Sequence, residues 1–349
     1  MKHIGICLRA DRPGSQSHRS ARSRIAGSVV KFALLASLVV SPNADPLAQG
    51  GSEGASPPMF QSEVTDQFGG VRRPTRIAIS NDGRIHVSDT LRGVVAIFDT
   101  AGRRVGTLTG FQEPLGLAVS VFKRCNRGCG AKCRVVRTAY VGDQADGSVA
   151  VFENGRRVRW LGAGAGEFVR PNGVAATRAQ VSYVLDTEAA HVKVFRPDGS
   201  LDGTFGSFGW GNGQFEYPID IALNEAAGEI YVADFGDPEW DSQRIAVFDL
   251  DGAWLRNLYP PDDDQGNPAF YRIAGLGVGP AGNLYVVDSA LASVAIITPN
   301  GILVDIIGYR LGSYWNGELE IPIDAATNGK ALYVTSSNDR LVKVFEAVQ

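Results

Sequence analysis

Histidine and cysteine, from which many metal and nucleophile sites are built, are scarce in this sequence. Its 349 residues include 4 histidines and 4 cysteines. Only His86 and His191 follow residue 48. Both fall in predicted strands, where an isolated histidine is more often packed or solvent-facing than a metal ligand. The cysteines form no Cys-x-x-Cys-His haem signature. The sequence therefore argues against haem attachment and against a histidine-rich catalytic centre.

An excess of basic residues is also missing. The chain carries 34 Lys and Arg against 37 Asp and Glu. Residues 1–48 hold seven of the basic and two of the acidic residues, so the rest of the chain has a net charge of −8. Binding to nucleic-acid phosphates requires a basic surface. The composition therefore disfavours nucleic acid as a partner.

The apolar run Ile25–Val40 is shorter than the roughly 20 residues that a membrane-spanning helix needs. It follows five arginines between residues 9 and 24, and it precedes Ser41-Pro42 and small residues. These are the parts of a secretory signal. We predict that residues 1–48 are a leader and that the protein is exported to the periplasm or beyond the cell. No stable membrane span would remain after cleavage. Tethering by an uncleaved leader is the alternative.

The rest of the chain is predicted to be a flexible lead-in followed by one domain. Residues 49–58 are small, polar and Pro-rich, which is typical of flexible segments. From 59 to 349, short runs rich in Val, Ile, Tyr and Phe alternate with Gly, Asp and Pro, a pattern of strands and turns. No helical pattern connects the strands, which excludes a parallel-sheet fold.

One four-stranded unit recurs six times in this domain. Its second strand ends at a marker position, and successive markers lie 54, 43, 48, 54 and 48 residues apart. The markers are Asp89, Asp143, Asp186, Asp234, Asp288 and Ser336. The first strands are predicted at 74–79, 114–119, 171–176, 218–223, 273–278 and 322–327. Periods of 40–50 residues with four strands each indicate the blades of an all-β, six-bladed β-propeller built from antiparallel sheets.

The repeated pattern P-x-G-[IL]-A, [IL]-Y-V-x-D, [RV]-[IV]-x-V-F, D-G and F-G resembles the NHL repeat. The resemblance covers about residues 60–349 and implies a six-bladed propeller. Glycine is expected near the start of each first strand, where backbones crowd around the axis. The recurring aspartates are expected to accept backbone hydrogen bonds in the turn that follows them, which is a structural role.

The sixth copy ends after its third strand, LVKVF. The segment 60–70 has no blade before it and resembles the fourth-strand region at 205–215. We therefore predict that a strand within 60–68 completes the sixth blade and closes the ring, which would remove two exposed sheet edges.

The insert between the first two strands of the second blade contains Cys125, Cys129 and Cys133, with six Lys and Arg around them. With Cys7 in the leader, three cysteines remain. The favoured interpretation for an exported protein is one disulfide and a third thiol that is free or paired with another molecule. A zinc site is the alternative, but it would require a fourth ligand.

Loops between the second and third strands, and those between blades, are expected to share one face, called the upper face here. Two long loops of the fourth blade bring acidic residues near exposed aromatic ones: Asp262, Asp263 and Asp264 with Trp240, Tyr259, Phe270 and Tyr271. They are either a recognition rim or ordinary solvated loops.

The third candidate site is the mouth of the central channel. It is expected to be lined by the residue that stands two positions after the leading residue of each repeat. Glycine occupies this position in three blades, and Arg76, Asp220 and Asp324 occupy it in the others, with Asn172 beside the ring. Arg76 and Asp324 belong to neighbouring blades and are positioned to pair. The set is either a ligand pocket, with a divalent cation as its one potential cofactor, or an internal ion pair.

Two functions follow from these features. The first is an exported, non-catalytic propeller that binds a protein or a small ligand through its upper face. The second is a metal-dependent hydrolase or lyase at the channel mouth. Lyases with related blades bind zinc through histidines directly after the blade proline, and lactonase-like propellers use a glutamate. This sequence has no histidine at those positions and no glutamate in an obvious first-strand position.

A thiol titration tests the cysteine prediction. Protein lacking residues 1–48, unfolded without reductant, should react with about one equivalent of Ellman's reagent. Three equivalents in protein from an oxidising compartment would reject the disulfide, and one bound zinc per chain would support the metal alternative.

Overall fold

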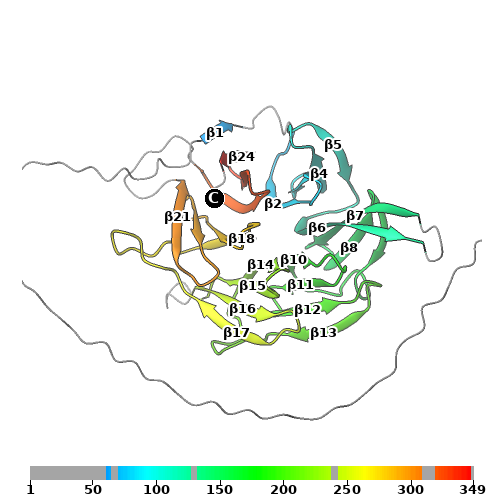
Figure 1. The fold of residues 1–349 in the computed structure, drawn as a ribbon. Coiled ribbons are helices and arrows are strands. Elements are labelled where there is room, and N and C mark those ends of the chain that lie inside the picture. The colour runs from blue at the N-terminus through cyan, green and yellow to red at the C-terminus, as the bar shows by residue number, and fades with distance from the viewer. Residues whose placement is uncertain (1–59, 64–69, 127–131, 237–242, 309–318, 347–349) are drawn as a thin grey trace, which may run out of the picture. The chain divides into compact units, whose positions relative to one another are not determined.

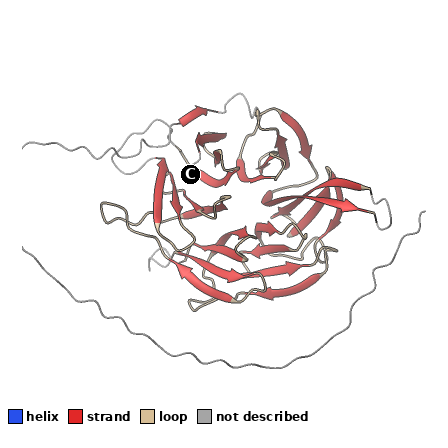
Figure 2. Ribbon diagram, in the orientation of Figure 1, coloured by secondary structure: helices blue, strands red, loops and turns tan. Residues whose placement is uncertain are grey.

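The computed structural model describes residues 60–63, 70–126, 132–236, 243–308 and 319–346. These ranges contain 24 strands in six four-stranded antiparallel sheets, arranged as blades of a ring (Figure 1). The described part of the chain consists of strand and loop without helix (Figure 2). It accordingly has no helix with the length and apolar character that crossing a membrane requires. The prediction of an all-β, six-bladed propeller is confirmed.

Four consecutive strands form each of the first five blades. Blade 1 contains β2 (Pro74–Ile79), β3 (Ile85–Asp89), β4 (Val94–Phe98) and β5 (Arg104–Leu108). Blade 2 contains β6 (Pro114–Cys125), β7 (Cys133–Asp143), β8 (Ser148–Glu153) and β9 (Arg156–Trp160). Blade 3 contains β10 (Pro171–Ala176), β11 (Ser182–Asp186), β12 (His191–Phe195) and β13 (Leu201–Phe205).

The second half of the ring repeats this order until the last blade. Blade 4 contains β14 (Pro218–Asn224), β15 (Glu229–Asp234), β16 (Arg244–Asp249) and β17 (Trp254–Leu258). Blade 5 contains β18 (Ile273–Val278), β19 (Leu284–Asp288), β20 (Ser293–Ile297) and β21 (Leu303–Gly308). Blade 6 contains β22 (Pro322–Thr327), β23 (Ala331–Ser336) and β24 (Leu341–Glu346), with β1 (Phe60–Glu63) paired to it.

The first strands lie nearest the axis, as β10, β14 and β18 show in Figure 1. Because neighbouring strands run antiparallel, the turns between strands one and two, and between three and four, share one face, called the lower face here. The connections between blades lie on the opposite, upper face. Second strands such as β11 are fully buried, whereas the outermost β13 is mostly exposed. The core therefore fills the spaces between successive blades.

The space between blades 3 and 4 illustrates how the core is built. Tyr183 and Leu185 of blade 3 pack in one buried cluster with Ile230, Val232 and Phe248 of blade 4. Burying one such side chain contributes about 1.5–3 kcal/mol. Each blade thus buries the apolar faces of its sheet against its two neighbours, which explains why a single blade could not be stable alone.

The recurring aspartates are structural. Asp89, Asp143 and Asp288 accept backbone hydrogen bonds in the turn that follows them, as expected. All five aspartates also bind a second set of amides that was not expected. Asp186 accepts hydrogen bonds from the backbone N–H groups of Val169 and Arg170, at 2.9 and 2.8 Å. These donors precede the first strand of the same blade rather than following the aspartate. Asp89, Asp143, Asp234 and Asp288 bind the equivalent pair of amides in their blades. Each aspartate therefore ties the interblade connection to its second strand.

The sixth blade performs the same task with a different residue. Its marker position is Ser336, which donates a hydrogen bond to Asp339 at 2.6 Å. Asp339 accepts from the Glu320 N–H at 3.4 Å and forms an ion pair with Lys343 at 3.0 Å. In blade 6, the carboxylate that binds the connection before the first strand therefore comes from Asp339 and not from the marker residue Ser336.

Strand β1 pairs antiparallel with β24, with Phe60 opposite Phe345 and Glu63 opposite Lys343. The partner strand is the last one of the chain, as the missing fourth strand of blade 6 leads one to expect. That this pairing is what holds the ring closed remains a prediction, and it can be tested by truncation.

Deleting residues 59–70 should lower the melting temperature by at least about 5 °C, because it strips a paired strand and leaves a sheet edge unpaired. Deleting residues 49–58 from the lead-in is the matched control and should change the melting temperature by less than about 2 °C. Calorimetry of both truncations makes the comparison. Equal melting temperatures would contradict closure by this strand.

Candidate functional site

The side chain of Arg76 in β2 crosses the central channel and is only 4 % exposed. Its Nη1 donates to Asp220 Oδ2 at 3.1 Å and to the carbonyl of Ala274 at 3.0 Å. Its Nη2 donates to the carbonyl of Ile219 at 2.8 Å and to Asn172 Oδ1 at 3.4 Å. One guanidinium from blade 1 thus binds blades 3, 4 and 5, at the upper ends of their first strands.

The predicted pairing of Arg76 with its neighbour Asp324 is wrong. The ion pair forms with Asp220, three blades away on the opposite side of the ring. Asp324 is instead engaged by backbone: its Oδ2 accepts from the N–H of Ile77 and its Oδ1 from the N–H of Ala325, both at 2.9 Å. Because backbone N–H groups bind Asp324, the guanidinium of Arg76 can form its ion pair with Asp220 across the channel.

Glycine in two blades makes room for the carboxylates. A Cβ added to Gly173 would lie 3.1 Å from Asp220 Oδ1, and one added to Gly275 would lie 2.8 Å from Asp324 Oδ1. The same Cβ on Gly275 would lie 2.3 Å from the carbonyl oxygen of Ile323. The expected crowding around the axis is real, and in these two blades it leaves space for the acidic side chain of the next blade.

Burial dominates the protonation of the two carboxyl groups. Burial, and after it the nearby Asp220 carboxylate, raise the pKa of Asp324 to about 8 against the opposing effect of Arg76. Burial also raises the pKa of Asp220, and Arg76 is the first of the groups that oppose this rise. Since one guanidinium serves two buried carboxyl groups, the cluster of Arg76, Asp220 and Asp324 carries one uncompensated acidic group.

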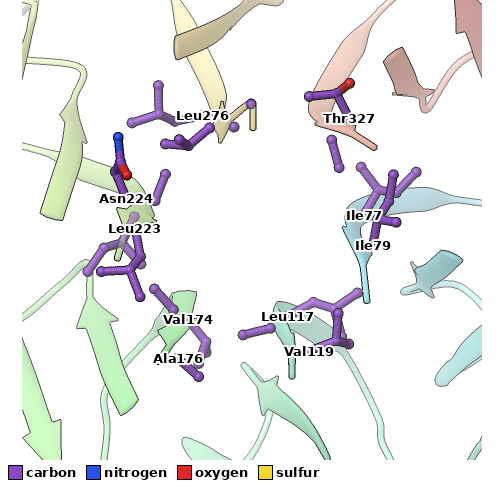
Figure 3. Close-up of a pocket in the computed structure, with 18 of the residues that line it drawn as sticks. Ile77, Ile79, Leu117, Val119, Val174, Ala176, Leu223, Asn224, Leu276 and Thr327 are labelled. Atoms are coloured by element: carbon purple, nitrogen blue, oxygen red, sulfur yellow. The ribbon is translucent and has the colours of Figure 1, made fainter. Parts of the chain in front are cut away.

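A pocket of about 490 Å³ fills the channel, with this charge cluster, named the floor here, at one end. The wall consists of apolar side chains from the first strands, including Ile77, Leu117, Val174 and Leu276, which surround the space in Figure 3. Its other end is lined by polar residues in the turns after the first strands: Asn81, Arg178, Asn224 and Glu225. Those turns lie on the lower face, so the pocket opens downward.

This geometry corrects the predicted site at the upper mouth of the channel. Arg76, Asp220 and Asp324 are each at least 95 % buried, so they do not form an exposed surface on the upper face. Asn172 touches the same network through Arg76. The sequence predicted that these residues surround the axis, but it did not predict the end from which the pocket opens, because the reach of Arg76 depends on the ring diameter.

The predicted acidic rim of the upper face is only partly exposed. Asp262 and Asp264 are exposed, whereas Asp263 is buried and accepts from the N–H groups of Gln265 and Asn267 at 2.6 and 2.9 Å. Asp263 therefore shapes its own loop. Phe270, expected among the exposed aromatics, is fully buried. Trp240 lies outside the described residues.

Five aromatic residues among the described ones are exposed on the upper face, and two of them, Tyr259 and Tyr271, were expected there. They belong to the connections between blades 3 and 4 and between blades 4 and 5: Phe208, Trp210, Tyr217, Tyr259 and Tyr271. We call this set the aromatic strip. The phenyl ring of Phe208 and the indole of Trp210 meet edge-on with centroids 5.9 Å apart. Phe208 and Trp210 belong to the segment FGSFGWGNGQF, which predicted only a fourth strand.

The cysteine insert forms a hairpin on the lower face, where β6 and β7 extend beyond the other blades (Figure 1). Cys125 and Cys133 face each other across these strands and form a disulfide, with Cα atoms 3.9 Å apart. Arg124 forms two 2.8 Å hydrogen bonds with Glu153, and Arg137 binds Asp82 of blade 1 at 2.5 Å. Cys129 lies outside the described residues.

The channel residues do not suit a divalent cation. Asn172 Oδ1 and Asp220 Oδ2 both accept from Arg76, and both carboxyl groups accept backbone N–H groups. A cation would have to displace the guanidinium from between its ligands. Among the described residues, no three His, Cys, Asp or Glu side chains group closely enough to hold a metal ion.

Comparison with known sequences gives limited similarity. No protein-family model matches the chain. Protein brain tumor of Drosophila melanogaster is 25% identical over 136 residues, which amounts to 39% of this chain and 12% of that protein. The chain therefore corresponds to a small part of that relative.

Solved structures share the fold at low sequence identity. A gluconolactonase from Xanthomonas campestris has 15% identity and a TM-score of 0.53, with 84% of this chain and 95% of that chain covered. A streptogramin B lyase has 12% identity and a TM-score of 0.50, with coverages of 80% and 84%. The virginiamycin B lyase of Staphylococcus aureus has 11% identity and a TM-score of 0.50, with coverages of 83% and 88%. These likenesses establish the propeller fold alone.

Asp324 should make the stability of the protein depend on pH. In the unfolded chain an aspartate titrates near pH 4, whereas burial raises the folded pKa of Asp324 to about 8. Its stabilising contribution is full below about pH 4 and is lost as the pH rises to about 8. Asp324→Asn cannot ionise, so its unfolding free energy should fall less steeply between pH 5 and 8, by up to about 1.4 kcal/mol per pH unit.

Urea denaturation of the parent and Asp324→Asn at pH 5, 6, 7 and 8 measures this difference. The exposed Asp264→Asn is the control and should keep the pH dependence of the parent. A parental slope in Asp324→Asn would contradict the assignment.

Proposed function

We propose that this protein is an exported, non-catalytic binding protein that holds a partner protein on the upper face of its propeller. The aromatic strip is the observation that carries the proposal. Trp210 is 70 % exposed and Phe208 65 % exposed, and both lie on one connection between blades. Exposed aromatic side chains grouped on one face mark interaction sites, whereas single exposed apolar residues are ordinary.

The shape of the strip favours a protein over a small ligand. The strip extends over two interblade connections, whereas small-molecule sites are concave and enclose most of the ligand. Tyr, Trp and Phe are enriched in protein interfaces, which are surrounded by a polar rim. Arg170 and Glu188 supply such a rim, since Arg170 Nη1 lies 3.2 Å from the Tyr217 hydroxyl and 3.1 Å from Glu188 Oε1.

The repeat framework holds the strip in place. The N–H of Tyr217 donates to Asp234 at 2.8 Å, and the N–H of Tyr271 donates to Asp288. Arg244, itself paired with Asp234, donates to the carbonyl of Trp210 at 3.1 Å. A surface ordered before binding loses less conformational entropy when the partner docks.

Export and membership in the NHL-repeat group are parts of this proposal. The leader composition of residues 1–48 supports export, and the six copies of the strand pattern support the family. The alternative is a metal-dependent hydrolase or lyase in the channel, a class suggested by the lactonase and lyase neighbours. It has less support because Arg76 occupies the space between the carboxylates that a metal would need.

Site-specific photo-crosslinking tests the proposal. A benzoylphenylalanine in place of Trp210 should capture one defined protein in cells that produce the propeller. The same probe in place of Ile302, which is 65 % exposed on the lower face, should not capture it. The captured protein is then identified, purified and titrated against the propeller.

Phe208→Ala and Trp210→Ala should each weaken that binding at least about tenfold, since buried aromatic anchors dominate interfaces. Folding should stay intact because exposed positions contribute little to stability. Ile302→Ala is the matched control and should bind like the parent. Parental affinity in both aromatic variants would refute the upper face as the binding surface.

A further inference from the structure

The channel pocket has an unequal balance of charge. Its lining includes five charged side chains: Arg76 and Arg178 are cationic, whereas Asp220, Glu225 and Asp324 are anionic. At the rim, Arg178 lies 3.8 Å from Glu225, so these two compensate each other. On the floor, Arg76 faces two carboxyl groups. The excess acidic group therefore lies at the deep end of the pocket.

Counting hydrogen-bond acceptors shows which carboxyl group is in excess. A carboxylate offers about four lone-pair positions. Asp220 uses three of them, for Arg76, the Leu276 N–H at 2.9 Å and the Ile221 N–H at 2.9 Å. Asp324 uses two, both for backbone N–H groups, and it accepts no hydrogen bond from a cationic side chain of the described residues. Asp324 is thus a buried carboxyl group with spare acceptor capacity in the floor of a pocket.

We propose that this pocket binds an organic cation, whose ammonium group contacts Asp324 while its apolar body fills the channel between the six first strands. The wall supports this assignment. Ile79, Val119, Ala176 and Leu223 of four different blades surround the space in Figure 3, so an apolar body would contact several first strands at once. The volume of about 490 Å³ lies within the range of small-molecule sites.

The residues of the floor favour a ligand with a single positive charge over a divalent metal, a carboxylate or a neutral ligand. An ammonium group needs only one or two free acceptor positions, which Asp324 provides. A divalent metal needs several oxygens released from other partners, and here Arg76 and backbone amides hold them. A carboxylate ligand would add a third acidic group to a cluster that has one guanidinium. A neutral ligand would form no ion pair with Asp324.

The protonation of Asp324 links ligand binding to pH. The charged groups that face it are Arg76 from β2 and Asp220 from β14, while β18 and β23 contribute no charged side chain. Because burial raises the pKa of Asp324 to about 8, an arriving ammonium group must displace a proton below that pH. Affinity for an organic cation should therefore increase as the pH rises from 6 to 8.

Calorimetric titration with three six-carbon probes tests the proposal on the whole propeller. n-Hexylammonium should bind at least about tenfold more tightly than n-hexanol or hexanoate, because the apolar body is the same and only the head group differs. Between pH 6 and pH 8 its affinity should rise at least about tenfold. At pH 7, titrations in buffers of different ionisation enthalpy should show release of up to one proton.

Three variants separate the head-group contact from the wall and from folding. Asp324→Asn should reduce hexylammonium binding at least about tenfold and abolish the proton release. Asp305→Asn is the matched control, because Asp305 accepts the N–H of the next residue as Asp324 does but lies in β21, outside the pocket lining. Ala176→Phe should block the pocket while leaving the floor intact.

Equal affinities for the three probes would overturn the proposal, as would unchanged binding in Asp324→Asn. If Asp324→Asn does not fold, the proposal is tested by the loss of binding in Ala176→Phe and by the proton release of the parent protein. Binding that persists in Ala176→Phe, or binding without proton release, would place the ligand elsewhere.

Discussion

The approach of six first strands to one axis is the constraint on which this structure depends. The position two residues after each leading residue admits either no side chain or one that reaches into the channel. Three blades use glycine there, and the others use Arg76, Asp220 and Asp324. A buried ion pair that loses one partner costs about 3–5 kcal/mol. The Arg76–Asp220 pair thus joins opposite sides of the ring at its upper end.

This crossing divides the molecule into two faces with different properties. The upper end of the channel is filled by an internal network, which leaves the loops between blades as the material for recognition. Below the network, the channel widens into a pocket whose wall is apolar and whose floor is acidic. A partner protein and a small organic cation would therefore meet different faces and need not compete.

The recurring aspartates connect the fold to the proposed interface. Each one holds two backbone amides of the connection that leads into its blade, and in blades 4 and 5 those amides include Tyr217 and Tyr271 of the aromatic strip. The residue that makes the repeat recognisable is therefore the residue that fixes the exposed loops. The aspartate has the structural role and the tyrosine has the proposed binding role, and a hydrogen bond from the tyrosine N–H to the carboxylate joins the two residues.

The sequence by itself determined the number of blades, the positions of the first strands and the residues around the axis, because strand periodicity and turn chemistry are local properties. It also supplied Cys125 and Cys133 as candidates for a disulfide, and the structure pairs them. It did not predict that the first strand of blade 2 continues from residue 119 to Cys125. The tertiary structure alone decided that Arg76 pairs across the channel, that Asp263 and Phe270 are buried, and that the pocket opens downward. These outcomes depend on distances between blades far apart in the chain, and no local pattern records such distances.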